Sequence, residues 1–218
     1  MIRVVAVAAA LAVAGLACSD GDDPVLAPMG TPASQPTTTV APSTTVAPTT
    51  TTAAAPTSAV RYVFPVQAGA SYSQTHAAYP ATDIFARCGT PVVAVTSGRI
   101  DELGRVDRWD PAADDPALRS GLFVSLVGDD GVRYYGSHFS ELSPGIDVGR
   151  RVVAGEPLAR IGQSGNARGK PCHVHFGISP PTGPGDWEVR RGVVWPWRYL
   201  DSWKAGGQLS PASEVGAR

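Results

Sequence analysis

The chain contains 218 residues, of which 18 are basic and 19 acidic, and its formal net charge is −1. This balance excludes the strongly basic surface that nucleic-acid binding requires, so we expect no nucleic-acid partner. A domain typically takes roughly 100–200 residues, and both ends of this chain differ in composition from its middle. We therefore expect one folded domain.

Residues 1–18 have the pattern of a secretory signal. They hold one arginine, Arg3, followed by a run of small apolar residues that ends at Cys18. This pattern is typical of a signal peptide rather than of a stable membrane-spanning helix. We expect export from the cytoplasm, with a short buried helix as the alternative.

The segment AGLAC at residues 14–18 resembles a bacterial lipobox, in which the cysteine becomes lipid-modified and forms the new N-terminus. Gly15 occupies the position at which that motif usually has leucine. The resemblance implies a lipoprotein-type signal peptide over residues 1–18 and a lipid on Cys18. The lipid would anchor the chain to the outer face of the cell membrane. The alternative is cleavage after an alanine and free secretion.

Residues 19–60 are predicted to be a disordered linker. From about Asp23 onward the segment consists almost entirely of Thr, Pro, Ala, Ser and Val. It has too few large apolar side chains to bury a core. Proline-rich chain extends by about 3.1 Å per residue, so the linker would reach on the order of 100 Å from its anchor.

Residues 61–206 are predicted to form an all-β domain, built on a single antiparallel sheet of open-barrel type with long loops. Their apolar residues form short runs separated by Gly, Pro and Asp rather than a helical period. The sequence around Gly128-Asp129-Asp130-Gly131 predicts a hairpin within residues 121–139. Further strands are predicted within residues 91–100, 150–155, 157–162 and 173–178.

Three other segments lack strand periodicity. Residues 106–120 are predicted to be an inserted surface loop. The segment WPWRYLDSW is predicted to open a short helix with Pro196 in its first turn. Residues 207–218 are small and polar, and we expect a disordered tail there.

The chain has three cysteines, Cys18, Cys88 and Cys172. If Cys18 carries lipid, the other two form an even pair in an oxidising compartment, which favours a disulfide. Two free thiols are the main alternative. A redox or metal role is disfavoured because neither cysteine has a second one at ligand spacing.

The four histidines are the main candidates for chemistry: His76, His138, His173 and His175. In the segment CHVHF, successive side chains of a strand alternate between faces, so His173 and His175 point the same way. Two imidazoles would then face one site. The alternative is a pair of half-exposed polar positions on a strand.

Asp83 leads into an apolar run and follows His76 along the chain. A carboxylate that enters a core is costly unless it is paired or bound to a metal, and imidazole with carboxylate suits zinc. The alternative is that Asp83 caps a turn and His76 lies on the surface. His138 follows two tyrosines at the end of a predicted strand, and taken alone it reads as an ordinary surface or core histidine.

These residues occur in an order that resembles the lysostaphin-like, LytM-type zinc endopeptidases of bacterial cell walls. The order is His76, Asp83, His138 and then His173-Val174-His175, which follow the segment IGQSGNARGKPC. The resemblance covers most of residues 64–178 and extends loosely to PWRYLDSW. It implies the duplicated-hybrid-motif type of all-β fold.

The resemblance implies that His76, Asp83 and His175 bind one zinc ion, while His138 and His173 are a catalytic pair that does not ligate it. Three protein ligands leave one position open, as expected of a catalytic zinc. In the family, three residues usually separate the first histidine from the aspartate. Here the six residues AAYPAT intervene, so this loop must bend back, and Pro80 could make the bend.

The activity implied is hydrolysis of peptidoglycan stem or cross-bridge peptides, in cell-wall remodelling outside the cytoplasm. One alternative is a non-catalytic LytM-type domain that binds cell wall or activates a partner amidase; another is a carbohydrate-binding or structural β-domain. Any regulatory partner is unknown. Tyr134, Tyr135 and the 106–120 loop are candidates for the groove wall. Ser164 is disfavoured as a nucleophile because Asn166 replaces the second glycine of the G-x-S-x-G elbow.

Overall fold

The computed structural model describes residues 59–218, which form nine β-strands, three α-helices and two 3-10 helices. The strands are β1 (Ser71–Tyr72), β2 (Thr82–Phe85), β3 (Pro91–Val93), β4 (Gly98–Gly104), β5 (Leu122–Gly128), β6 (Arg133–Leu142), β7 (Arg151–Val152), β8 (Pro157–Ile161) and β9 (His173–Ser179). The helices are η1 (Pro116–Leu118), η2 (Gly165–Ala167), α1 (Trp187–Arg190), α2 (Trp197–Lys204) and α3 (Ala212–Gly216). The expected signal peptide at 1–18 and all but the last two residues of the expected linker at 19–60 lie outside the described residues, so both stay predictions.

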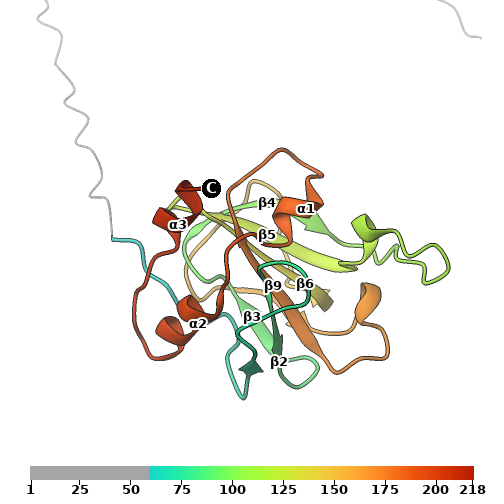
Figure 1. Cartoon of the computed structure of the whole chain (residues 1–218). Coiled ribbons are helices and arrows are strands. Elements are labelled where there is room, and N and C mark those ends of the chain that lie inside the picture. The colour runs from blue at the N-terminus through green and yellow to red at the C-terminus, as the bar shows by residue number, and fades with distance from the viewer. Residues whose placement is uncertain (1–58) are drawn as a thin grey trace, which may run out of the picture. The chain divides into compact units, whose positions relative to one another are not determined.

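All nine strands belong to one sheet in which every pair of neighbours is antiparallel. The main path runs β1-β2-β9-β6-β5-β4-β7, and β8 pairs with both β3 and β6. Figure 1 shows the strands gathered at the centre and the helices at the periphery. The path is open, because β1 and β7 lie at its two ends, which confirms the predicted all-β class. No helix among residues 59–218 is long and apolar enough to cross a membrane.

The predicted hairpin and inserted loop are both present. β5 ends at Gly128 and β6 starts at Arg133, and Gly131 takes a positive φ of 75° in the turn between them. Glycine accepts that conformation without steric cost. The segment between β4 and β5 contains only the single 3-10 turn η1, so residues 106–120 form a loop as expected.

Strand β6 changes partner along its length. Its first half pairs with β9 and its second half with β8, and the register shifts after Phe139. His138 lies at this change with φ of 69°, a left-handed conformation that is rare for a residue with a side chain. The sequence pattern predicted that a strand ends at His138. This prediction was wrong, because β6 contains a β-bulge at this point and continues to Leu142.

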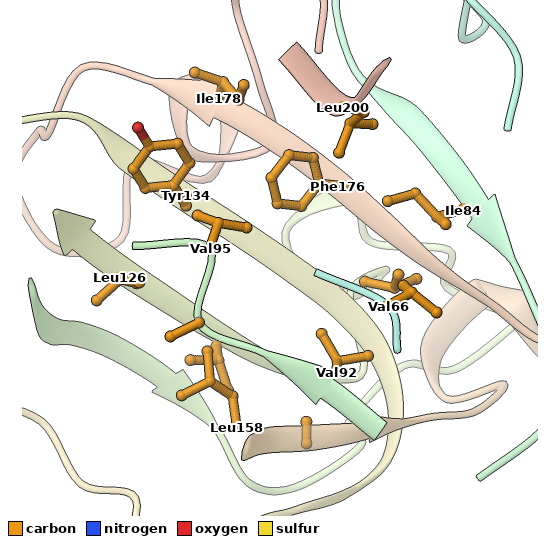
Figure 2. Close-up of a cluster of buried hydrophobic side chains, with 14 of the residues drawn as sticks. Val66, Ile84, Val92, Val95, Leu126, Tyr134, Leu158, Phe176, Ile178 and Leu200 are labelled. Atoms are coloured by element: carbon orange, nitrogen blue, oxygen red, sulfur yellow. The ribbon is translucent and has the colours of Figure 1, made fainter. Parts of the chain in front are cut away.

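The alternation of β9 separates the core from the site. Val174, Phe176 and Ile178 are at most 4% exposed and belong to the hydrophobic core. Figure 2 shows Phe176 and Ile178 in this core beside Tyr134 of the neighbouring strand β6. The intervening residues His173 and His175 therefore face the opposite side of the sheet.

The C-terminal helix α2 contributes to the core. The predicted helix is present as α2, with Pro196 at its N-cap and with Tyr199, Leu200 and Trp203 buried. Figure 2 shows Leu200 at the edge of the core cluster. The ring of Trp203 stacks on Tyr62, with 5.4 Å between the ring centroids and an interplanar angle of 7°.

The expectation of a disordered tail over residues 207–218 was wrong. The Gln208 side chain accepts from the backbone N–H of Tyr62 at 2.7 Å and donates to its carbonyl at 3.1 Å. Helix α3 buries Val215 to 6% exposure, and the Tyr199 hydroxyl donates to Glu214 at 2.8 Å. A few anchoring contacts order a segment whose composition alone gives no sign of them.

Candidate metal and catalytic centre

Asp83 and His175 are brought together by the pairing of two strands. They lie directly opposite each other in the antiparallel pair of β2 and β9. Residues opposite one another on one face of such a pair have side chains in contact range. Nδ1 of His175 lies 3.1 Å from Oδ1 of Asp83.

His76 reaches the same place from the loop between β1 and β2. Its Nε2 lies 3.5 Å from Oδ1 of Asp83, and its ring centroid is 4.8 Å from that of His175 in an edge-on arrangement. Ala77, directly after it, takes a positive φ of 25°. The six intervening residues thus form a bend that returns His76 to Asp83, as the sequence required.

One ligand atom from each of His76, Asp83 and His175 lies within 4.8 Å of the others. Two ligands of a tetrahedral zinc, each about 2.0–2.2 Å from the ion, would be about 3.3–3.6 Å apart. The two shorter separations in the structure, 3.1 and 3.5 Å, are close to that value. The group therefore fits a metal of zinc size.

The hydrogen-bond partners of the two His175 ring nitrogens are also compatible with a cation bound in this group. Its Nε2 lies 2.9 Å from the carbonyl oxygen of Arg191, while its Nδ1 faces Asp83. Both ring nitrogens thus face oxygen acceptors, but a neutral imidazole carries a single N–H. With the N–H on Nε2 donated to Arg191, a metal ion near Nδ1 would satisfy the remaining lone pair and the carboxylate together.

His138 and His173 lie beside this group with a different orientation. Nδ1 of His138 lies 3.0 Å from the carbonyl oxygen of Ser164, and Nδ1 of His173 lies 2.8 Å from that of Pro171. Because a carbonyl can only accept, each Nδ1 carries the proton and each Nε2 keeps a free lone pair in the neutral ring. The two ring centroids are 5.0 Å apart.

The pKa values of Asp83, His76 and His138 are all lowered from their usual values. Burial alone would raise the pKa of Asp83, but its hydrogen bond and electrostatic interaction with His175 outweigh burial and lower the pKa to about 2. Burial lowers the pKa of His76, and burial together with His175 and His173 lowers the pKa of His138 to about 3. At neutral pH the carboxylate is ionised, and His76 and His138 are neutral.

All five side chains line one cleft of about 510 Å³. This is within the usual size range of small-molecule and peptide sites. Pro116 and Arg119 of the inserted loop also line it, as does Tyr135. Tyr134 does not: it faces the core, and its hydroxyl donates to Asp130 at 2.5 Å. The expectation for Tyr134 was wrong because consecutive residues of a strand face opposite sides.

A disulfide lies directly beside a cleft histidine along the chain. Cys88 and Cys172 are bonded, with 5.3 Å between their Cα atoms, as the cysteine count predicts. The bond joins the segment after β2 to the residue directly before His173. It therefore holds in place the chain that carries one of the cleft histidines.

Ser164 has a structural role. Its hydroxyl accepts from the backbone N–H of Leu122 at 2.9 Å, and its carbonyl accepts from His138. The next residue, Gly165, donates its N–H to Asp107 at 2.9 Å and has φ of 64°. The segment is thus a turn that positions His138.

Two contributors to the cleft have no motif in the sequence. Trp187 and Arg191, at the two ends of α1, line the cleft, and Arg191 also supplies the carbonyl that binds His175. Nothing in the local pattern of residues 180–195 indicated either contribution. Only the packing of α1 against β9 brings them to the site.

The arrangement defines a class of protein. Three potential metal ligands with an open side, next to two buried histidines that the ligand set does not use, form a candidate hydrolytic metal centre. The model of peptidase family M23 matches residues 77–186, half of the chain, and the chain belongs to this family. The matched region contains Asp83, His138, His173 and His175, and it begins one residue after His76.

The chain is also similar to several solved structures. The catalytic domain of lysostaphin from Staphylococcus simulans is 24% identical, with a TM-score of 0.45, over 65% of this chain and 90% of that domain. A putative glycyl-glycine endopeptidase lytM from Ruminococcus gnavus is 20% identical, with a TM-score of 0.45, over 62% of this chain and 64% of that one. A putative peptidase M23 from Pseudomonas aeruginosa is 19% identical, with a TM-score of 0.47, over 64% of this chain and 50% of that one. No curated protein matches the chain.

Proposed function

We propose that the chain is a zinc-dependent endopeptidase that hydrolyses peptide bonds of peptidoglycan stem or cross-bridge peptides. The observation that carries this proposal is the convergence of His76, Asp83 and His175 in one cleft with His138 and His173. Membership of a peptidase family supports the reaction type. The cell-wall substrate follows from the resemblance to LytM-type enzymes together with the expected export of the chain.

His76, Asp83 and His175 would hold the zinc through Nε2, Oδ1 and Nδ1. Zinc bound there would supply a Lewis acid that lowers the pKa of water and polarises the scissile carbonyl. The carbonyl of Arg191 orients the His175 ring, and such outer contacts fix which nitrogen faces the metal.

His138 and His173 would move the protons. Each presents a free Nε2 lone pair, since its Nδ1 is occupied by a backbone carbonyl. One of the two rings would accept a proton at Nε2 from the attacking water, and the imidazolium so formed would stabilise the oxyanion and return that proton to the leaving amine. The left-handed backbone of His138 is consistent with a residue whose position is set by function.

The location proposed for the enzyme is the outer face of the cell membrane. A lipid on Cys18 would anchor the chain, and the linker at 19–60 would let the catalytic domain act at a distance within the wall. Replacement of Cys18 by serine should move the protein from the membrane fraction to the soluble fraction. A protein that stays membrane-bound after this change would contradict the anchor.

The activity is tested on purified peptidoglycan. The chain from about residue 60 onward should release new amino groups, and treatment with a chelator should abolish the release. Zinc added back should restore it. Release that is unaffected by chelation would contradict a metal-dependent mechanism, and absence of release with zinc bound would favour the non-catalytic alternative.

A further inference from the structure

The cleft contains an arginine held between two aromatic rings. The guanidinium carbon of Arg191 lies 4.0 Å from the ring centroid of Tyr79 and 4.9 Å from that of Trp187. All three side chains are half-buried and line the cleft. Cation–π contacts of this kind hold a guanidinium plane in one orientation without neutralising its charge.

Arg191 has no anionic partner within the part of the chain that the structure describes. No carboxylate forms an ion pair with it among residues 59–218. Its Nε is buried and lacks a hydrogen-bond acceptor. The charge of Arg191 is therefore free to attract an anionic ligand.

The other arginine of the cleft differs in this respect. Arg119 donates from Nε and Nη2 to the two carboxylate oxygens of Asp114, at 2.9 and 2.6 Å. Its charge and its fork of donors are therefore already used. Among the described residues that line the cleft, Asp83 is the one acidic side chain, and it belongs to the proposed metal site.

Arg191 is also close to the proposed metal site. The ring of Tyr79 that carries the guanidinium lies 4.7 Å from the ring of His76, centroid to centroid. One aromatic ring thus separates the guanidinium from a proposed metal ligand. An extended peptide spans the separation between the guanidinium and His76, one aromatic ring wide, in roughly two or three residues.

We infer that Arg191 is a specificity-determining residue that binds a free carboxylate of the substrate, within a few residues of the scissile bond. The inference rests on the proposed peptidase function and deepens it. The guanidinium fork matches a carboxylate with two parallel hydrogen bonds, and its stacking on Tyr79 and Trp187 sets the geometry before binding. The enzyme therefore favours acidic stem peptides over neutral bridges such as oligoglycine, which offer Arg191 nothing to bind.

The test compares one substrate in two charge states. The probe is a set of cross-linked muropeptides with free carboxylates, and the same muropeptides after conversion of the carboxylates to carboxamides. We expect the zinc-loaded wild type to cleave the free-acid form at least about tenfold more efficiently, mainly through a lower KM. Arg191→Gln should lose this preference, so that the ratio of the two cleavage efficiencies approaches one.

Two variants complete the design. Arg191→Lys keeps the charge but loses the fork, and it should keep only part of the preference. Arg151→Gln removes an arginine that pairs with Asp129 outside this cleft, and it should keep the preference in full. Thermal melting of each variant identifies any that fails to fold.

Binding to the metal-free protein gives a readout that does not depend on turnover. Titration calorimetry should show tighter binding of the free-acid muropeptide by wild type and equal binding of both forms by Arg191→Gln. Equal binding of both forms by wild type would overturn the inference, as would an equal loss on both forms in Arg191→Gln. Carboxylate-dependent binding without cleavage by the zinc-loaded chain would support the inference and contradict the peptidase function.

Discussion

Nδ1 of His175 lies 3.1 Å from Oδ1 of Asp83, and the two residues are direct partners across strands β9 and β2. The backbone register therefore fixes the distance between two of the proposed ligands. The third, His76, is supplied by a loop. The site is thus built mainly on the sheet, which limits how far its geometry can relax when no metal is bound.

Replacement of Asp83 by asparagine should weaken zinc binding. The charge and the geometry of the carboxylate both favour the cation, and partners that only orient metal ligands already account for 10–100-fold in affinity in typical sites. We expect a loss of more than about 100-fold, measured by competition with a chromophoric chelator. Asp201→Asn, which alters a carboxylate bonded to Tyr72 elsewhere, is the matched control. Equal zinc affinity of Asp83→Asn and wild type would contradict the ligand assignment.

Replacement of Asp107 by asparagine should lower turnover without touching the proposed ligands. Its Oδ2 accepts from the N–H of Gly165 at 2.9 Å and from Arg168 at 2.7 Å, and thus fixes the turn whose Ser164 carbonyl orients His138. We expect kcat to fall roughly 10–100-fold while bound zinc stays constant. An unchanged kcat would show that the turn does not need this contact.

The lowered pKa of Asp107 predicts that the stability of the domain depends on pH. Burial alone would raise the pKa of Asp107, but the Gly165 N–H and Arg168 outweigh it and the pKa is lowered. A carboxyl group whose pKa is lower in the folded state stabilises the fold above its unfolded pKa and loses this contribution as pH falls through the folded value. The difference in melting temperature between wild type and Asp107→Asn should be largest near neutral pH and shrink below about pH 4. A difference that grows on acidification would contradict the sign.

Reduction of the disulfide should destabilise the domain. The bond between Cys88 and Cys172 closes a loop over a sequence separation of 84 residues. A loop of that length corresponds to about 3–5 kcal/mol in the chain-entropy treatment of the unfolded state. Urea unfolding with and without reductant measures the change, and Cys88→Ser should match the reduced protein. Thiol titration of the unfolded, unreduced domain should detect no free thiol from these two residues.

Deletion of residues 208–218 should lower stability and leave the metal site intact. The segment supplies the buried side chain of Val215 and the paired hydrogen bonds between Gln208 and Tyr62. Burial of one aliphatic side chain alone is worth about 1.5–3 kcal/mol. We expect a loss of at least that size in the free energy of unfolding. An unchanged melting temperature would indicate that the tail contributes nothing.

The sequence predicts those features that depend on local pattern. Alternation in β9 predicted that His173 and His175 share a face, and the glycines around Asp129 predicted the hairpin, because both properties follow from a few neighbouring residues. The bend that returns His76 to Asp83 was a requirement of the family resemblance rather than a deduction from AAYPAT.

Features that depend on distant contacts were missed. The tail from Gln208 is ordered through Tyr62, which lies 146 residues away along the chain. Arg191 reaches the cleft only because α1 packs on β9, and strand pairing beyond His138 depends on β8. Neither composition nor periodicity contains this information, since each contact joins segments that are far apart in sequence.

The most direct test of the proposed function measures zinc content and amine release from peptidoglycan on the same preparations of wild type, His138→Ala and His175→Ala. Wild type should hold close to one zinc per chain. His138→Ala should keep its zinc and lose about 10²–10⁴-fold in cleavage, the usual contribution of a general acid or base. His175→Ala should lose both zinc and cleavage. Unchanged cleavage in both variants would contradict the proposed centre.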